Sequence, residues 1–208
     1  MQTGGPDYAV PLGRRDGLTY ATQNQTLTDF PPPWSTASTI VDSLGTKNLD
    51  PTDVVAVSGG HTIGISHCSS FIDRLYPTQD PMMDKNFAKY LKKICPTITA
   101  NTITVLDIRS PYVFDNKYYV NLMNRQGVLN SDQGLYGYSK TKDIVTSFAV
   151  NQSLFFENFV IAMTKLGQIS VLTGNQGEIR DNCSVTNFNN KDYLASRVNI
   201  NMGASSEF

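Results

Sequence analysis

The chain has 208 residues, and 17 basic against 18 acidic side chains give it a net charge of −1. With 40% hydrophobic and 17% charged residues, it has the composition of one globular domain rather than of a disordered chain. The balanced charge argues against nucleic-acid binding, and no apolar run approaches the roughly 18 residues that a membrane-spanning helix needs. Residues 1–6 lack the basic and apolar regions of a signal peptide.

The N-terminal segment, residues 1–34, has few periodic apolar positions. It ends in a run of prolines, Pro31 to Pro33, followed by Trp34. Prolines fix an extended and rigid backbone. We therefore expect a connector here rather than a helix.

Several later segments carry helix signals, either apolar residues near the i, i+3, i+4, i+7 spacing or, at residues 50–57, proline and acidic residues in a first turn. They lie at residues 37–44, 50–57, 87–94, 114–122 and 155–166. Ser35 or Thr36 can cap the first of them, Pro51 suits the first turn of the second, and Gly167 follows the last. Because alternation at period two is nearly absent, we predict a mainly α-helical fold with long irregular loops and at most minor β-structure.

Cys68 and Cys95 lie 27 positions apart, whereas Cys183 stands alone near the C-terminus. In a secreted protein, an odd cysteine suggests a missing partner. The residues that follow, 184–208, are rich in Asn and Ser and are expected to form a flexible tail. Glycosylation sequons occur at Asn24, Asn151 and Asn182.

The chain has two histidines, His61 and His67. His61 lies in the run Ser-Gly-Gly-His-Thr-Ile-Gly at residues 58–64, whose glycines let the backbone approach something flat and large. The spacing of the two histidines matches no zinc pattern. A lone histidine in a helical protein is usually structural, so this motif alone leaves both interpretations open.

A second motif spans residues 107–115, Asp-Ile-Arg-Ser-Pro-Tyr-Val-Phe-Asp. Asp107, Ser110, Asp115 and the Val113 carbonyl can offer oxygens to a hard cation such as Ca²⁺, although the spacing is not that of an EF-hand. The alternative is a turn followed by a helix that Asp115 caps.

A third motif is Ser-Asp-Gln at residues 131–133. Asp132 follows the apolar pair Val128–Leu129 and can be drawn into the interior, where a buried carboxylate needs a partner such as a histidine N–H. The alternative is an aspartate in a surface turn.

These motifs occur in one order with two more, Val-Pro-Leu-Gly-Arg-Arg-Asp at residues 10–16 and Leu-Thr-Gly-x-x-Gly-Glu-Ile-Arg at residues 172–180. The set resembles the plant secretory haem peroxidases, the class III family, from about Gly4 to Cys183. The resemblance implies that residues 1–183 form the proximal, C-terminal part of a haem-peroxidase domain.

The resemblance also implies roles for single residues around haem b. His61 would bind the iron through Nε2, and Asp132 would accept a hydrogen bond from His61 Nδ1–H, which stabilises high-valent iron. Ile63 and Leu106 would contact the haem. Pro31 would flank the haem edge where aromatic reductants dock.

A structural Ca²⁺ is implied in the same way. Its ligands would be the oxygens of Thr62, Asp107, Ser110, Val113 and Asp115, with Val113 contributing its carbonyl. Cys68 and Cys95 would form a disulfide, and Cys183 would lack its partner.

In the family, an N-terminal half carries the distal histidine and arginine that cleave the peroxide bond, and we expect this chain to lack that half. The resemblance implies a peroxidase that uses hydrogen peroxide to oxidise phenols and so removes peroxide under oxidative stress. The alternative is a non-catalytic haem- and calcium-binding remnant or a truncated gene product. We expect a monomer, secreted to the cell wall or vacuolar, that binds neither nucleic acid nor membrane.

Overall fold

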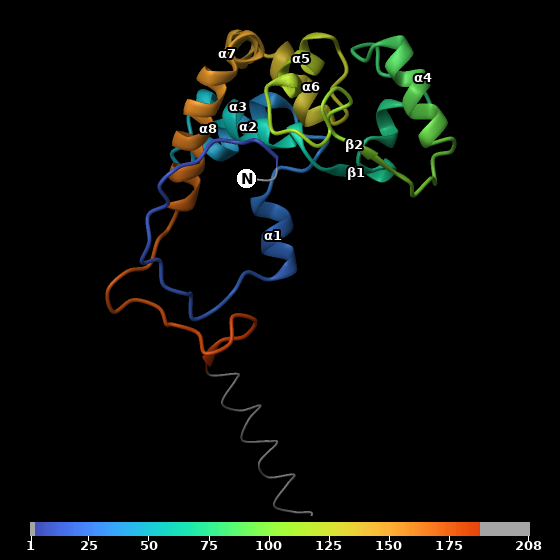
Figure 1. Ribbon diagram of the computed structural model, residues 1–208. Coiled ribbons are helices and arrows are strands. Elements are labelled where there is room, and N and C mark those ends of the chain that lie inside the picture. The colour runs from blue at the N-terminus through green and yellow to red at the C-terminus, as the bar shows by residue number, and fades with distance from the viewer. Residues whose placement is uncertain (1–2, 188–208) are drawn as a thin grey trace, which may run out of the picture. The chain divides into compact units, whose positions relative to one another are not determined.

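The computed structural model describes residues 3–187, and within them the fold is mainly α-helical, as predicted (Figure 1). The chain separates into two compact units. The first comprises the N-terminal residues up to Val10 together with Leu27–Ile169, and the second comprises Pro11–Thr26 and the residues from Ser170 onward. Every candidate site residue lies in the first unit. The proposed boundary between a domain at 1–183 and a tail stays a prediction, since the tail lies mostly outside the described residues.

The regular elements follow one another with short or irregular connections. The helices are α1 (Gln23–Asp29), α2 (Ala37–Gly45), α3 (Pro51–Ser58), α4 (Lys85–Ile94), α5 (Lys117–Met123), α6 (Asn130–Gly137), α7 (Ser139–Val150) and α8 (Gln152–Gly167). The strands are β1 (Ile65–His67) and β2 (Ile103–Val105). Single 3₁₀ turns cover Gly59–Thr62, Cys68–Ser70 and Ile72–Arg74.

Side-chain caps explain where several helices begin. Thr36 caps α2 by accepting a hydrogen bond from Thr39 N, so of the two candidate caps Thr36 is the one used. Asp50 and Asp53 form a reciprocal capping box around Pro51 at the start of α3. Asn151 Oδ1 accepts from Leu154 N at the start of α8. Helix α8 ends at Gly167, as predicted.

The helix prediction was wrong at three places. A short helix, α1, lies in the segment expected to be a connector, and Thr22 and Gln25 hydrogen-bond to each other at its start. Helix α5 begins at Lys117, so Phe114 precedes it. Helices α6 and α7 were not predicted. Their sequences, Asn130–Gly137 and Ser139–Val150, contain many polar residues, so their apolar periodicity is weak.

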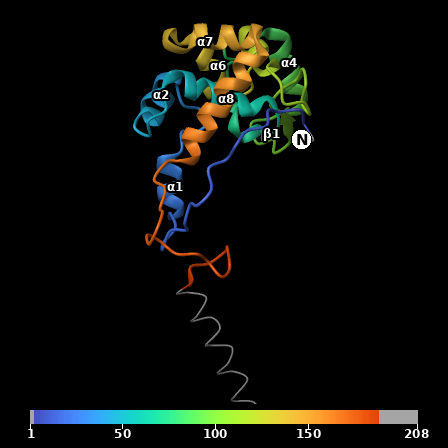
Figure 2. The ribbon, with the colours of Figure 1, turned by 60° about the vertical axis from the view of Figure 1, so that its left-hand side comes forward.

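One core of the first unit, which we call the aromatic cluster, is formed mainly by α2, α3, α5, α7 and α8. Figure 2 labels three of these helices, α2, α7 and α8. Phe155 is fully buried at its centre, and its ring lies 5.0 Å from that of Tyr119 and 5.6 Å from that of Phe114, between centroids. The buried members are Ala37, Ile40, Val41, Leu49, Val54, Val55, Ala56, Phe114, Tyr118, Tyr119, Leu122, Leu135, Val145, Phe148, Phe155 and Ala162.

A second core, the disulfide cluster, lies around α4 and the irregular segments on either side of the sheet. Cys68 and Cys95 form a disulfide with a Cα–Cα distance of 5.9 Å, which confirms the predicted pairing. Its buried members are Cys68, Phe71, Leu75, Met83, Phe87, Ala88, Leu91, Cys95, Leu106, Val128 and Leu129.

The two strands form one antiparallel sheet in which Ile65 pairs with Val105 and His67 with Ile103. Leu106 N also donates to Gly64 O, at 3.1 Å, so the pairing continues one step toward residue 61. Gly64 has φ +114°, a conformation that favours glycine. This register brings the segment after His61 alongside the segment before Asp107.

The second unit is held by backbone pairing and by Arg180. Arg15 pairs with Leu172, and Asp16 with Glu178, in isolated antiparallel bridges. Arg180 donates to the carbonyls of Gly17 and Cys183. Cys183 is exposed and has no disulfide partner among the described residues. No described helix is both long and apolar enough to cross a membrane.

Candidate functional site

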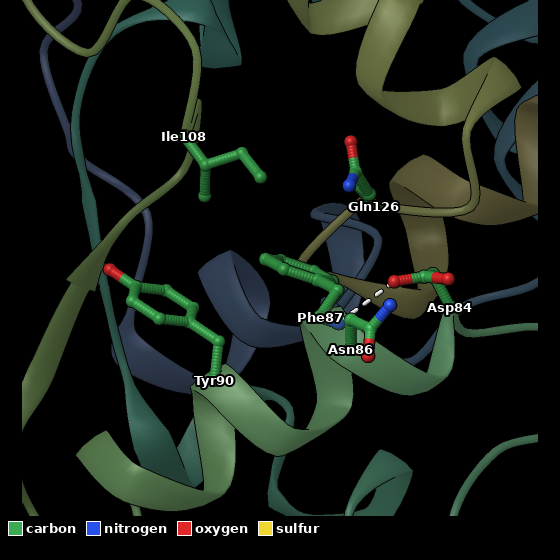
Figure 3. A pocket seen from close by; sticks show the side chains of 6 residues that line it. All are labelled: Asp84, Asn86, Phe87, Tyr90, Ile108 and Gln126. Carbon is green, nitrogen blue, oxygen red and sulfur yellow. Dashed lines mark hydrogen bonds between the residues drawn. The ribbon is translucent and has the colours of Figure 1, made fainter.

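A pocket of about 380 Å³ lies beside α4, and none of the predicted site residues lines it (Figure 3). Its only acidic side chain is Asp84, whose Oδ1 accepts from Phe87 N at 2.9 Å and caps α4. The lining residues are Asp84, Asn86, Phe87, Tyr90, Ile108 and Gln126. The candidate chemistry therefore lies elsewhere, around His61.

His61 sits in the single 3₁₀ turn that follows α3. The turn packs so closely that a Cβ atom at Gly59 would collide with the Tyr119 hydroxyl and the Phe155 ring. Glycine at position 59 thus lets the end of α3 press onto the aromatic cluster. The His61 side chain itself remains 41% exposed, so part of the imidazole faces away from the protein.

The structure brings His61 and Asp132 together across 71 residues of sequence. His61 Nδ1 lies 3.0 Å from Asp132 Oδ1, and the carboxylate is buried in the first turn of α6. The charge of Asp132 raises the pKa of His61 above its usual 6.5, against the opposing effect of burial. Asp132 is therefore a buried hydrogen-bond partner and not a surface-turn residue.

This pairing decides what the imidazole can bind. With Nδ1–H donated to Asp132, the neutral ring carries its free lone pair on Nε2, and no described residue forms a hydrogen bond with that nitrogen. A half-exposed imidazole with a carboxylate behind it is the arrangement of a metal-ligating histidine. These residues fit a haem group, whose iron His61 would hold through Nε2.

The oxygens of the predicted cation ligands converge on one another. Thr62 Oγ1 lies 3.2 Å from Asp107 Oδ2, 3.4 Å from Asp115 Oδ1 and 3.5 Å from Val113 O. Ser110 Oγ lies 2.9 Å from Asp115 Oδ1 and 3.5 Å from Asp107 Oδ2. We call these five residues the oxygen cluster.

The oxygen cluster fits Ca²⁺ by its chemistry. A hydroxyl has one hydrogen to donate, so Thr62 cannot satisfy three acceptor oxygens at once, whereas a shared cation can. Calcium prefers hard oxygen ligands at about 2.3–2.6 Å, and the two carboxylates match its charge. No group of three His, Cys, Asp or Glu side chains suited to a metal occurs in residues 3–187. The oxygen cluster has two carboxylates, and its other oxygens come from two hydroxyls and a carbonyl.

Neighbouring donors orient Asp107, which is fully buried. Its Oδ1 accepts hydrogen bonds from Arg109 N at 2.8 Å, Ser110 N at 3.2 Å and Asn121 Nδ2 at 2.7 Å. Only Oδ2 is then left for the oxygen cluster. Asp115 also accepts from Lys117 N, at the first residue of α5, at 2.7 Å. The N-cap position of α5 is Asn116, so the alternative of a helix capped by Asp115 was wrong.

The remaining predicted residues, Ile63, Leu106 and Pro31, differ in exposure. Leu106 is 9% exposed and belongs to the disulfide cluster, while Ile63 is partly buried against the aromatic cluster. Pro31 is half-buried. Their predicted contacts with haem or with a reductant stay predictions.

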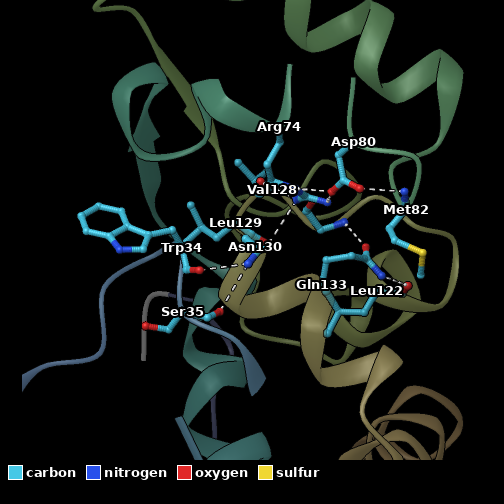
Figure 4. A network of polar contacts seen from close by, with 11 residues as sticks. Trp34, Ser35, Arg74, Asp80, Met82, Leu122, Val128, Leu129, Asn130 and Gln133 are labelled. Atoms are coloured by element: carbon cyan, nitrogen blue, oxygen red, sulfur yellow. Dashed lines mark hydrogen bonds and ion pairs between the residues drawn. The ribbon is translucent and has the colours of Figure 1, made fainter. Parts of the chain in front are cut away.

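The start of α6, and with it Asp132, is anchored by the buried Arg74 (Figure 4). Arg74 Nη1 donates to the carbonyls of Gly127, Val128 and Leu129 at 2.6, 2.7 and 3.1 Å. Its Nε and Nη2 each lie 2.9 Å from Asp80 Oδ2. The guanidinium thus fixes the loop that leads into the helix carrying Asp132.

The segment that follows Pro31 also forms hydrogen bonds with the first residues of α6. Asn130 Nδ2 donates to Trp34 O at 3.0 Å (Figure 4). Ser131 N donates to Pro33 O at 2.9 Å. These bonds satisfy groups at the first turn of α6, which has no side-chain cap. The segment after Pro31 is therefore connected to the helix of Asp132 by one backbone bond and one bond from the Asn130 side chain.

Comparison with known proteins shows the family of this chain. The family model described as peroxidase matches residues 1–151. The chain belongs to the peroxidase family. This peroxidase chain is 60% identical over 185 residues to Peroxidase 12 of Arabidopsis thaliana, covering 89% of the chain and 52% of that relative. It is 47% identical over 205 residues to Cationic peroxidase SPC4 of Sorghum bicolor, covering 99% and 57% respectively.

These matches confirm the resemblance inferred from the sequence motifs. The peroxidase chain spans about half the length of the curated relatives it matches; a third, Peroxidase 49 of Arabidopsis thaliana, is 44% identical and 58% covered.

The sequence reasoning missed three side chains that organise the site of this peroxidase. Tyr118 hydrogen-bonds to Asp132, Asn121 to Asp107, and Arg74 to the loop before α6. The first two had a usable signal. They follow Asp115 in the run Asp-Asn-Lys-Tyr-Tyr-Val-Asn, where helical spacing places Tyr118 and Asn121 on one face. Arg74 had none, because its partners are main-chain carbonyls.

Proposed function

We propose that this chain provides the proximal side of a class III haem peroxidase, an enzyme that uses hydrogen peroxide to oxidise phenolic donors. The observation that carries the proposal is the 3.0 Å contact between His61 Nδ1 and the buried Asp132 Oδ1. It leaves Nε2 as the free ligand atom on an imidazole that is 41% exposed. Membership of the peroxidase family supports the same role.

His61 acts as the iron ligand and Asp132 as its hydrogen-bond acceptor in this proposal. The carboxylate holds the imidazole in the Nδ1–H tautomer and makes Nε2 a stronger electron donor. Haem, when bound, supplies the electron transfer between peroxide and donor. Arg74 holds the loop before α6 through its carbonyls and so helps to position Asp132.

The oxygen cluster would hold Ca²⁺ next to the iron ligand. Thr62 directly follows His61, and its hydroxyl lies 3.2 Å from Asp107 Oδ2. A cation there would tie the turn of His61 to the loop of residues 107–115. Ile63 and Leu106 would contact haem, and Pro31 would lie at the edge where phenols dock.

A secreted or vacuolar location and a monomeric state complete the proposal. The Cys68–Cys95 disulfide suits an oxidising compartment. Hydrogen peroxide and small phenols are the partners, and stress-linked peroxide removal is the role.

A second candidate for the 208 residues by themselves is haem and calcium binding without turnover. The observation that favours it concerns histidine: besides His61 the chain has His67, which lies in strand β1 opposite Ile103. His67 is exposed, and no contact among the described residues brings it to His61 as an acid–base group.

Haem titration of the chain tests the proposed ligand. We expect a histidine-ligated absorption spectrum that is lost in His61→Ala and kept in the control His67→Ala, since His67 is exposed and outside the site. Equal spectra for wild type and His61→Ala would refute the assignment.

Stopped-flow kinetics then separates the two candidates. Each missing acid–base or oxyanion group costs about 10²–10⁴ in rate, so the haem-loaded chain alone should show only trace guaiacol oxidation. Joining it to the N-terminal half of a family member should restore turnover. Trace activity in both forms would favour the binding role.

A further inference from the structure

Asp132 has a second hydrogen-bond donor besides His61. Tyr118, on α5, donates its hydroxyl to Asp132 Oδ1 at 3.0 Å. This is the same oxygen that lies 3.0 Å from His61 Nδ1. One carboxylate oxygen is therefore shared between the imidazole and a phenol.

The environment of Tyr118 keeps its hydroxyl protonated, so that it remains a hydrogen-bond donor. Its side chain is 2% exposed, and burial, together with the charge of Asp132, raises its pKa well above the usual 10.0. It is therefore protonated across the ordinary pH range, and within residues 3–187 its hydroxyl donates to Asp132 Oδ1 alone.

The ring of Tyr118 also contacts the imidazole. Its centroid lies 6.3 Å from that of His61 with the two planes 79° apart, an edge-to-face arrangement. Tyr118 thus touches both members of the pair, the carboxylate with its hydroxyl and the imidazole with its ring.

We propose that Tyr118 is a positioning residue that limits how strongly Asp132 polarises His61. A charge-assisted hydrogen bond draws its strength from the negative charge on the acceptor oxygen. When two donors share that oxygen, each receives less of the charge than it would alone. The inference deepens the proposed function, because its consequence for catalysis depends on His61 binding iron.

Tyr119 offers a matched control on the same helix. It is also fully buried and belongs to the same aromatic cluster, but its hydroxyl donates to Val55 O at 2.9 Å and not to Asp132. Tyr118→Phe and Tyr119→Phe each remove one buried hydroxyl and keep the ring. They differ in whether the lost bond was to Asp132.

The first measurement needs no haem. In the chain labelled with ¹⁵N-histidine, the His61 Nδ1–H proton resonance reports the strength of the bond to Asp132, and His67→Ala assigns it because the chain has two histidines. We expect this resonance to move downfield in Tyr118→Phe and to stay in place in Tyr119→Phe. No shift, an upfield shift, or the same shift in both variants would overturn the inference.

The second measurement uses the chain reconstituted with haem. Without the Tyr118 hydroxyl, the charge of Asp132 Oδ1 acts on His61 alone and makes the imidazole a stronger electron donor. The ferric–ferrous reduction potential should therefore fall in Tyr118→Phe and not in Tyr119→Phe. A structural role for the ring would leave the potential unchanged in both variants.

The two measurements distinguish the possible failures. If wild-type haem is not histidine-ligated, the proposed function fails while the proton resonance still tests the role of Tyr118. If ligation is normal and neither readout responds to Tyr118→Phe, the inference fails and the proposed function stands.

Discussion

The aromatic cluster and the disulfide cluster stabilise neighbouring parts of the first unit by different means. The aromatic cluster packs fully buried rings such as Phe148 and Phe155 between regular helices. The disulfide cluster has one longer helix, α4, and otherwise irregular chain, and it contains the Cys68–Cys95 bond and lies beside the buried Arg74. In the disulfide cluster, which has few regular helices, a covalent bond and an ion pair contribute to stability together with apolar burial.

Asp132 lies on a stretch of chain that runs from the disulfide cluster into the aromatic cluster. Leu129, just before α6, belongs to the disulfide cluster, and Leu135, within α6, belongs to the aromatic cluster. His61, in contrast, follows directly from α3 of the aromatic cluster. The His61–Asp132 contact therefore depends on both regions, and each can be weakened separately.

The largest effect is expected in the aromatic cluster. Phe155→Ala removes a fully buried ring that contacts several others, and such a truncation lowers the free energy of unfolding by about 3–5 kcal/mol. Urea denaturation followed by circular dichroism measures it. The control is Phe156→Ala on the same helix, where the ring is only partly buried and the loss should be smaller. Equal losses would mean that Phe155 is not the centre of this core.

Removal of the disulfide should come next. For a loop closed across 27 residues, the chain-entropy estimate gives a loss of about 3–4 kcal/mol in Cys68→Ala/Cys95→Ala. Cys183→Ala is the matched control, because that thiol is exposed and unpaired in the described chain, and its effect should stay within about 0.5 kcal/mol. A double variant as stable as the control would contradict the view that this region depends on its covalent link.

Calcium should have a smaller effect that depends on concentration. At 100 times its Kd, the ion should raise the free energy of unfolding by about 2.7 kcal/mol, measured by thermal unfolding with calcium and with a chelator. Asp107→Asn should abolish this gain, because Asp107 Oδ2 faces the oxygen cluster. Asp42→Asn, at an exposed position in α2, should keep it. A gain that survives Asp107→Asn would place the cation elsewhere.

The sequence predicted those features that depend on local pattern or on family motifs. Caps and apolar spacing located α2, α3 and α8, and the motif order identified His61, Asp132 and the oxygen cluster. Helix α6 escaped prediction because its N-terminus is satisfied by the distant Pro33 carbonyl and not by a cap in its own sequence. Tertiary partners of this kind leave no local signal.

The contacts of Arg74 also could not be read from the sequence. A buried guanidinium needs partners, but nothing in the residues around position 74 says that Gly127, Val128 and Leu129 supply them through their carbonyls. The sheet register is a similar case, since three-residue strands are too short to show alternation.

Because Arg74 binds main-chain carbonyls, the loop before α6 can accept many side-chain substitutions. Its Nη1 bonds to carbonyl oxygens, which every amino acid carries, so another apolar residue at position 128 or 129 retains the acceptors. Gly127 is the exception, because a Cβ atom there would lie 2.7 Å from Leu122 Cδ2. Most side-chain substitutions in the loop should therefore leave the position of Asp132 unchanged. Insertions or deletions in the loop should shift it.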